Sequence, residues 1–190
     1  MCRVSGTYVA LLRGINVGGR NVIPMAALKS CFEREGFDGV STYIQSGNVL
    51  FDADETSPAA LARRIEKALS HAFRYEASVV LRSRKELRSV VDRSPKGFGA
   101  DADAYRYDVV FLKEPLDAAT ALKSVSTRPG VDQAWGGTGV LYFSRLIRKA
   151  SRSRLSKLTS QPAYRMMTIR NWNTTTTLLR LMEGDRGRAR

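Results

Sequence analysis

Residues 42–51, TYIQSGNVLF, form the stretch that decides the fold. Two runs rich in β-branched and aromatic residues flank the dipeptide Ser46-Gly47. Because a short glycine-containing turn between two such runs is typical of a β-hairpin, we predict antiparallel strands over Val40–Ile44 and Val49–Asp52. The elements on either side of this hairpin then define the architecture.

Each side of the hairpin adds one strand and one helix. Before it, an apolar run predicts a strand over Tyr8–Leu12, and the next pattern predicts a helix over Pro24–Glu35. After it, Ser57 is a predicted N-cap and Pro58 the first residue of an amphipathic helix. A strand over Ala77–Leu81 follows, so the predicted order is β-α-β-β-α-β.

The same order of elements starts again after a helical linker around 84–92, although the residue identities do not repeat. A βαββαβ unit is the ferredoxin-like plan, in which two helices cover one face of an antiparallel sheet. The predicted elements of the second unit are a strand over 105–113, a helix over 115–125, strands over Val131–Trp135 and Val140–Phe143 joined at Gly136-Gly137, a basic helix over Ser151–Thr159, a strand over Met166–Ile169 and a last helix over Trp172–Met182.

We therefore predict an α+β protein made of two ferredoxin-like βαββαβ halves with antiparallel sheets, plus a C-terminal helix. The halves span residues 1–83 and 105–183, a helical linker spans 84–104, and residues 184–190 form a disordered polar tail.

Composition indicates a globular protein of the cytosol. Hydrophobic residues make up 43% of the 190-residue chain, and its longest apolar runs fall far short of the ~20 residues that a membrane helix needs. The first residues lack the pattern of a signal peptide, and two cysteines cannot make a disulfide framework. We expect no membrane association and make no prediction of the oligomeric state.

The positive charge is concentrated near the C-terminus. The chain has a formal net charge of +13, and residues 145–190 hold 12 basic side chains against 2 acidic ones. Such an asymmetry favours a polyanionic partner for this quarter of the chain. Solubility is the alternative explanation, and composition does not decide between them.

The loop "RGINVGGRN", residues 13–21, resembles a phosphate-binding loop without completing the pattern. Arg20 and Asn21 stand where the G-x-x-x-x-G-K-[ST] motif needs lysine and a hydroxyl, which disfavours a nucleotide triphosphatase. The glycines either let a tight loop adopt positive φ or expose amides that grip a phosphate or carboxylate without magnesium. If the loop binds an anion, the candidate ligand-binding residues are Arg13, Gly14, Asn16, Gly18, Gly19 and Arg20.

Two further segments carry hydrogen-bonding side chains at turns. The hairpin presents Gln45, Ser46 and Asn48, which either shape the turn or read a polar ligand beside the glycine loop. The stretch "RNWNT" joins a strand to the last helix, which Asn173 or Thr174 could cap. Its candidate ligand-binding residues are Arg170, Asn171, Trp172 and Asn173, and packing is the alternative for Trp172.

The segment "SRLIRKASRSRLSKL", residues 144–158, is the strongest candidate for contact with phosphates. It contains six cations and no interleaved aromatic residue, which favours backbone contacts over base reading, while a solvated helix face is the alternative. The candidate nucleic-acid-binding residues are Arg145, Arg148, Lys149, Arg152, Arg154 and Lys157.

The sequence names no catalyst. His71 is the only histidine and lies within the helix after Ser57, so a histidine-based triad or metal cluster has little to build on. We predict no metal site and no cofactor, and whether the protein is an enzyme stays open.

Four stretches, "YVALLRGINVGGRNVIPMAALKSCFEREGF", "VSTYIQSGNVLF", "VVFL" and "TIRNWNT", closely resemble the domain of unknown function 1697 family of bacterial proteins. The resemblance extends from Tyr8 to about Met182. It implies two ferredoxin-like halves, in agreement with the repeat of elements, and it implies no activity. One segment departs from the family: where members show a Gly-Arg-Ser-Lys-Leu-like helix start, this chain has "IRKASRSRLSKL", with Ser153 at the serine position, no glycine and additional arginines.

Three functions are compatible with these observations. The first is a module that binds a phosphate-bearing partner, above all nucleic acid, through the basic segment and Arg170, with the glycine loop as a second contact. The second is an enzyme acting on a small phosphorylated or carboxylated metabolite in a cleft between the halves. The third is a partner-binding module, which predicts a large apolar patch on an exposed sheet face.

Overall fold

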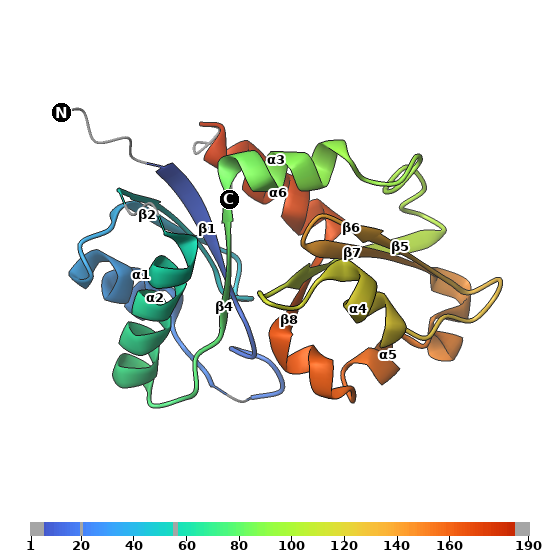
Figure 1. Ribbon diagram of the computed structural model, residues 1–190, viewed down its shortest axis with the longest axis horizontal. Helices are drawn as coiled ribbons and strands as arrows, with labels where there is room; N and C mark the ends of the chain where they lie inside the picture. The colour runs from blue at the N-terminus through green and yellow to red at the C-terminus, as the bar shows by residue number, and fades with distance from the viewer. Residues whose placement is uncertain (1–5, 20, 55–56, 185–190) are drawn as a thin grey trace. The chain divides into compact units, whose positions relative to one another are not determined.

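The computed structural model describes residues 6–19, 21–54 and 57–184. The chain divides into two compact units, one formed by residues 1–87 with 178–190 and the other by residues 88–177 (Figure 1). Among the described residues no helix has the length and apolar character needed to cross a membrane. The predicted tail beyond Gly184 lies outside the described residues.

The first unit is built on one four-stranded antiparallel sheet. The strand order is β2-β3-β1-β4, which is the order of a ferredoxin-like fold. Its elements are β1 (Gly6–Leu12), α1 (Met25–Arg34), β2 (Asp38–Tyr43), β3 (Asn48–Ala53), α2 (Pro58–Phe73) and β4 (Val79–Ser83), followed by α3 (Arg84–Asp92), which continues into the second unit.

Local signals position these elements as the sequence predicts, with small shifts. Ser57 caps α2 by accepting a hydrogen bond from the backbone N–H of Ala60 at 3.3 Å. The predicted hairpin is confirmed, but its strands end at the pair Tyr43 and Asn48. Ile44 therefore belongs to a four-residue turn and not to β2. The reason is the backbone of Ile44, which has a φ of 49° and cannot continue a strand.

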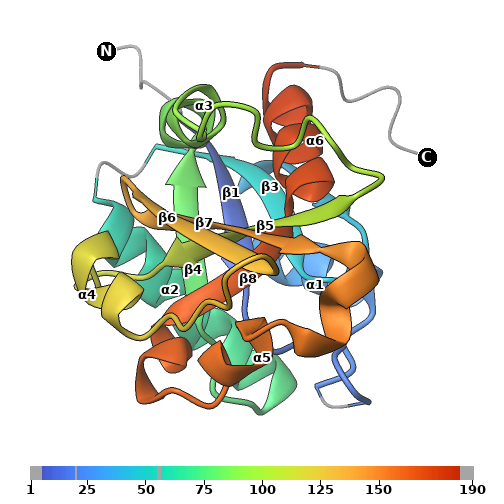
Figure 2. The ribbon, with the colours of Figure 1, turned by 90° about the vertical axis from the view of Figure 1, so that its right-hand side faces the viewer.

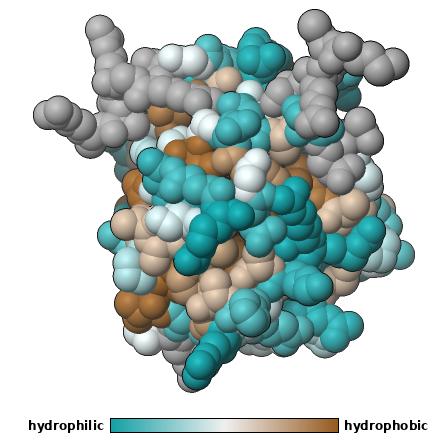
Figure 3. Space-filling model, turned by 90° about the vertical axis from the view of Figure 1, so that its left-hand side faces the viewer, coloured by the Kyte–Doolittle hydropathy of each residue, from teal (hydrophilic) through white to brown (hydrophobic). Residues whose placement is uncertain are grey.

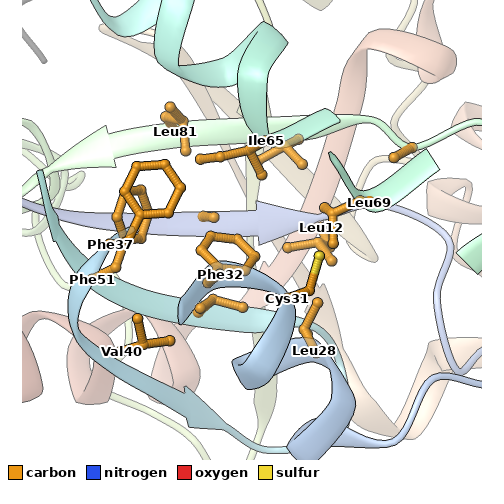
Figure 4. Close-up of a cluster of buried hydrophobic side chains, with 14 of the residues drawn as sticks. Leu12, Leu28, Cys31, Phe32, Phe37, Val40, Phe51, Ile65, Leu69 and Leu81 are labelled. Atoms are coloured by element: carbon orange, nitrogen blue, oxygen red, sulfur yellow. The ribbon is translucent and has the colours of Figure 1, made fainter. Parts of the chain in front are cut away.

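The core of the first unit lies between the sheet and the helices α1 and α2 (Figure 4). Three phenylalanines from α1, the following loop and β3 form its centre: Phe37 and Phe51 have ring centroids 4.8 Å apart, and Phe32 and Phe51 5.3 Å apart. Cys31 is buried in the same cluster, and burial raises the pKa of its thiol. Hydrophobic packing therefore accounts for this cysteine.

The second unit repeats the arrangement. Its antiparallel sheet has the order β6-β7-β5-β8, which matches the first sheet strand for strand and confirms the predicted two ferredoxin-like halves. Its elements are β5 (Tyr105–Leu112), α4 (Ala118–Lys123), β6 (Asp132–Gly137), β7 (Val140–Leu146), the 3₁₀ helix η1 (Ile147–Arg152), α5 (Leu155–Leu158), the 3₁₀ helix η2 (Pro162–Met166), β8 (Met167–Asn171) and α6 (Trp172–Met182), which belongs to the first unit from Leu178 onward.

Several predicted boundaries in this unit are wrong. Helix α4 begins at Ala118 instead of residue 115, because the Asp117 carboxylate caps it by accepting a hydrogen bond from the Thr120 N–H at 2.8 Å. The β6–β7 turn lies at 138–139, where Gly139 has a φ of 68°, so Gly136 and Gly137 belong to the strand. The predicted basic helix over 151–159 is mostly irregular, and only its part 155–158 is α-helical.

Helices α4 and α5 lie on one side of the second sheet (Figure 2). The core on this side includes Val110 and Leu112 from β5, Phe143 from β7 and Leu155 and Leu158 from α5. Because side chains alternate along a strand, the intervening residues of β5 and β7 face the other side, where the candidate pocket described below is formed.

Candidate functional site

The glycine loop after β1 is closed on itself by hydrogen bonds. The backbone N–H of Asn16 donates to the Asn21 carbonyl at 3.1 Å, and the Asn21 side-chain amide donates to the Gly14 carbonyl at 2.9 Å. Gly18 and Gly19 are exposed and have φ values of 58° and 72°, with open space where a Cβ would stand. Backbone conformation thus explains these glycines.

The Asn16 side chain ties this loop to the β2–β3 hairpin. Its oxygen accepts from the Ile23 N–H at 2.8 Å, and its nitrogen donates to the carbonyls of Ile23 at 3.1 Å and Gln45 at 2.9 Å. These three bonds commit the amide to the fold. Asn16 therefore holds two loops together instead of presenting an open hydrogen-bonding group to a ligand.

The hairpin turn faces the glycine loop. A Cβ at Gly47 would lie 2.6 Å from Cδ1 of Ile15, and the Gly47 carbonyl accepts a hydrogen bond from the Leu12 N–H at 2.8 Å. Asn48 is fully buried, and its amide donates to the Tyr43 carbonyl at 2.9 Å and to the Ser46 hydroxyl at 3.0 Å. The turn is thus built largely from its own polar groups.

Few of the predicted ligand-binding side chains of the first unit are exposed. The side chain of Gln45 is exposed, Arg13 is half-buried, and Arg20 lies outside the described residues. The loop and the turn also expose apolar side chains: Val17, Val22 and Ile44 are 66%, 72% and 48% exposed. On the side of the molecule seen in Figure 3, hydrophilic side chains are interspersed among hydrophobic ones.

The RNWNT junction belongs to the second unit and has a structural role. Arg170 is only 7% exposed, and its Nη1 donates to the Thr168 hydroxyl at 2.9 Å and to the Ile169 carbonyl at 2.8 Å. Burial lowers the pKa of its guanidinium to about 10. Such an arginine is poorly placed to meet a phosphate in solution.

The remaining residues of the junction start helix α6. Asn171 caps the helix by accepting a hydrogen bond from the Thr174 N–H at 2.7 Å, so the predicted caps Asn173 and Thr174 are wrong by two or three positions. Trp172 packs edge to face on Phe98 with a centroid distance of 5.1 Å. Asn173 is exposed.

The basic segment 145–157 has three parts. Arg145 lies near the end of strand β7, the 3₁₀ helix η1 is kinked at Lys149 with φ −121° and ψ 20°, and Ser153 is extended before the short helix α5. The six cations therefore do not lie on a single helix. The non-helical residues interrupt the hydrogen-bond ladder that such a helix would need.

The six cations differ in how far they are engaged by the protein. Arg145 lies 3.6 Å from the Asp108 carboxylate, and Lys149 donates to the Gly130 carbonyl at 3.4 Å. Nη1 of Arg154 donates to the Ser126 hydroxyl at 3.1 Å and to the Thr127 carbonyl at 3.2 Å. The other three are exposed and make no side-chain hydrogen bond or ion pair with the described residues: Arg148, Arg152 and Lys157.

A pocket of about 250 Å³ lies on the second sheet's face opposite α4 and α5. The segment 95–98 forms one wall, and strands β5, β6 and β7 form the rest. The side chains from the strands are mostly aromatic or amide-bearing: Tyr105, Tyr107, Gln133, Trp135 and Ser144.

Phe98 holds the aromatic walls of this pocket in place. Its buried ring is 4.9 Å from Tyr107 and 6.1 Å from Trp135, centroid to centroid, and it also packs on Tyr142 at 5.3 Å. All three contacts are edge to face, which is a favourable geometry for aromatic pairs. The pocket is therefore a preformed feature of the packed second unit.

Polar groups in the pocket are available for a ligand. Ser144 is 3% exposed, and its hydroxyl has no hydrogen-bond partner among the described residues. The same is true of the Trp135 indole N–H and the Gln133 side-chain amide within that part of the chain. Lys96 is exposed on the rim.

Sequence reasoning missed this pocket completely. The alternation Tyr105-Arg-Tyr107 places two aromatic rings on one face of a strand, and that pattern is visible in the sequence. The sequence does not show which face of the sheet the two rings occupy, or that Phe98 and Trp135 lie beside them. Both depend on strand pairing and on the path of residues 93–104.

The comparisons with known proteins identify the family. The sequence matches the model of the family described as "Protein of unknown function (DUF1697)" over residues 6–142, so the chain belongs to this family. The solved structure of the conserved bacterial protein SP0830 from Streptococcus pneumoniae is similar, with a TM-score of 0.80 and 27% sequence identity. The match covers 94% of this chain and 99% of that one. No curated protein matches.

Proposed function

We propose that the protein binds nucleic acid through the basic segment of its second unit. The observation that carries the proposal is the triad of exposed cations Arg148, Arg152 and Lys157, whose side chains are not engaged by the described part of the protein. Guanidinium and ammonium groups held out from the surface are the groups that neutralise backbone phosphates. Such a partner is abundant in the cytosol, which is the location we propose.

The charge around this segment supports the proposal. The sequence contains no aspartate or glutamate between Asp132 and Glu183, so no acidic side chain alternates with the cations. Asp132 itself accepts hydrogen bonds from the backbone N–H groups of Arg154 at 2.8 Å and Arg128 at 3.3 Å. A cationic surface of this kind attracts polyanions and speeds their association.

The proposal differs from the sequence-based hypothesis in its contact residues. Arg170 is left out because it is buried, and Arg154 because it holds the loop at 126–127. The glycine loop would contribute only the backbone amides of Gly18 and Gly19, and the proposed binding does not depend on it. Lys149 and Arg145 can add long-range charge.

The test is fluorescence anisotropy with short single- and double-stranded DNA and RNA, measured from about 50 to about 200 mM salt. The affinity of the wild type should fall steeply with salt. The double variant Arg148→Glu/Arg152→Glu should bind at least about tenfold more weakly, with a salt slope reduced by about 2, because two phosphate contacts are lost.

A matched control is the double variant Arg63→Glu/Lys67→Glu. Both residues are exposed on α2, in the first unit, and the formal charge changes by the same amount. This variant should bind much as the wild type does. Equal losses in the two variants, or binding that ignores salt, would overturn the proposal, and so would no binding at low salt.

No observation on the described residues favours the alternative function, an enzyme that binds its substrate in a cleft between the halves. Its predicted donors Asn16 and Asn48 are committed to backbone carbonyls within the first unit, and Arg170 is buried in the second. Those groups therefore have roles in the fold that need no substrate.

A further inference from the structure

We propose that the pocket on the second sheet receives one unpaired base of a bound single strand. This inference rests on the proposed function and names its substrate class: single-stranded nucleic acid. Four features support it, namely the size of the pocket, its aromatic walls, its open polar groups and its position next to the basic segment.

The size fits a small planar group. Pockets for drug-sized ligands measure about 300–1,000 Å³, and this one measures about 250 Å³. It is therefore suited to a group smaller than a drug, such as one base without its neighbours. The flexible, charged sugar-phosphate chain would stay outside, where the cations are.

The walls suit stacking. Tyr105 and Tyr107 have ring centroids 6.1 Å apart and stand on the same face of β5, while Trp135 lines the pocket from β6. Stacking of a base on an aromatic side chain contributes about 1–3 kcal/mol and works with every base. Aromatic residues on a central strand of a four-stranded sheet are also how RNA-recognition domains bind unpaired bases.

The polar groups match the edge of a base. Gln133 and Ser144 are paired across β6 and β7, so their side chains are neighbours on the same face. The amide of Gln133 can donate and accept at once, and the Ser144 hydroxyl can do either. A buried hydroxyl with an open hydrogen bond gains most from a ligand that completes it.

The pocket and the cations meet where the sheet ends. Tyr105 pairs with Leu146, the last residue of β7, and the next residue, Ile147, donates its N–H to the Ala104 carbonyl at 2.8 Å. The basic helix η1 thus starts beside the first aromatic residue of the pocket. A nucleic-acid strand whose phosphates lie along η1 would bring its bases to the mouth of the pocket.

Fluorescence of Trp135 provides the test. The chain has two tryptophans, so the variant Trp172→Phe reports from Trp135 alone, and phenylalanine keeps a ring against Phe98. A short single strand should quench this emission. An abasic strand of the same length, which keeps the phosphates, should bind at least fivefold more weakly and leave the emission unchanged.

Tyr105→Ala is the matching substitution, because the Tyr105 ring contacts only Tyr107 among the aromatic rings of the described residues. It should weaken binding of the normal strand by about fivefold to a hundredfold and leave the abasic strand unaffected. Tyr105→Phe should restore the affinity. Thermal melts of the three proteins check that each is folded.

The outcomes separate this inference from the proposed function. Equal, salt-dependent binding of normal and abasic strands would overturn the base pocket and leave nucleic-acid binding intact. Quenching of Trp135 by a nucleoside monophosphate, with no strand bound at low salt, would support the base site and overturn the proposed function. Absence of both effects would overturn both.

Discussion

The side-chain amide of Asn16 donates a hydrogen bond to the backbone carbonyl of Gln45 at 2.9 Å, which joins the glycine loop to the hairpin 29 residues away. Asn16 also has a φ of 54°, a conformation that asparagine tolerates better than most residues. Both facts explain an asparagine at this position by structure alone, without a ligand.

The first prediction follows from this bond. Asn16→Ala should lower the free energy of unfolding by about 2–4 kcal/mol, because it leaves backbone groups of Ile23 and Gln45 without their partner and places alanine at positive φ. Urea denaturation measures the loss. Gln45→Ala keeps the carbonyl and should cost less than about 0.5 kcal/mol. A similar loss in both variants would show that the side chain of Gln45 matters instead.

The second prediction concerns the close approach of the hairpin turn to the loop. Gly47→Ala should cost about 2–4 kcal/mol, because φ is 74° and the new Cβ would meet Ile15 at 2.6 Å and Leu12 at 3.0 Å. Gly18→Ala is the control: its φ of 58° is similar, but its Cβ would stand in open space. That variant should lose only about 1–2 kcal/mol. Equal losses would mean that backbone strain alone decides the cost.

The third prediction concerns alkaline pH. The buried Tyr142 hydroxyl donates to the Val90 carbonyl at 2.6 Å, and burial raises its pKa from 10 to about 12. Because the folded-state pKa lies above the unfolded one, the stability due to this group is complete below pH 10 and is lost as pH rises toward 12. Tyr142→Phe should be less stable than the wild type by about 1 kcal/mol at pH 8.

The difference between the two proteins is the quantity to measure, by urea denaturation from pH 8 to about pH 12, since Tyr75 titrates in the same range and is present in both. The advantage of the wild type should shrink above pH 10 and vanish. An advantage that stays constant over this range would contradict the assigned role of the Tyr142 hydroxyl.

Much of the fold could be predicted because its signals are local. Ser57 and Pro58 start α2 as predicted, and α6 spans the predicted Trp172–Met182. The errors arise where a nearby competitor is stronger, as when Asp117 caps α4 in place of the earlier proline. Strand β7 also runs three residues further than predicted, to Leu146, because β5 supplies backbone partners there.

The candidate site could be predicted only in part. The sequence locates the cations but does not show which of them are engaged: Arg154 bonds to Thr127, 27 residues earlier in the chain, and Arg170 is buried within a sheet. The pocket brings together Phe98, Tyr107 and Trp135, whose meeting is set by strand order. Alternation along one strand reveals a face and does not reveal what covers it.

The fourth prediction separates two arginines that the sequence treats alike. Arg154→Ala should lower the free energy of unfolding by about 1–2 kcal/mol, because Nη1 bridges the Ser126 hydroxyl and the Thr127 carbonyl. Arg152→Ala should change stability by less than about 0.5 kcal/mol, because Arg152 is exposed and makes no contact of this kind with the described residues.

The effects of these two substitutions on nucleic-acid binding should have the opposite order to their effects on stability. Arg152→Ala removes an accessible cation and should reduce the salt slope of nucleic-acid binding by about 1, whereas Arg154→Ala should leave the slope nearly unchanged while the protein is folded. Denaturation curves and anisotropy titrations of the same two variants check both halves of the prediction. If Arg154→Ala reduced the slope and Arg152→Ala did not, the phosphates would follow the start of α5 instead of η1, and the path proposed past the pocket would be wrong.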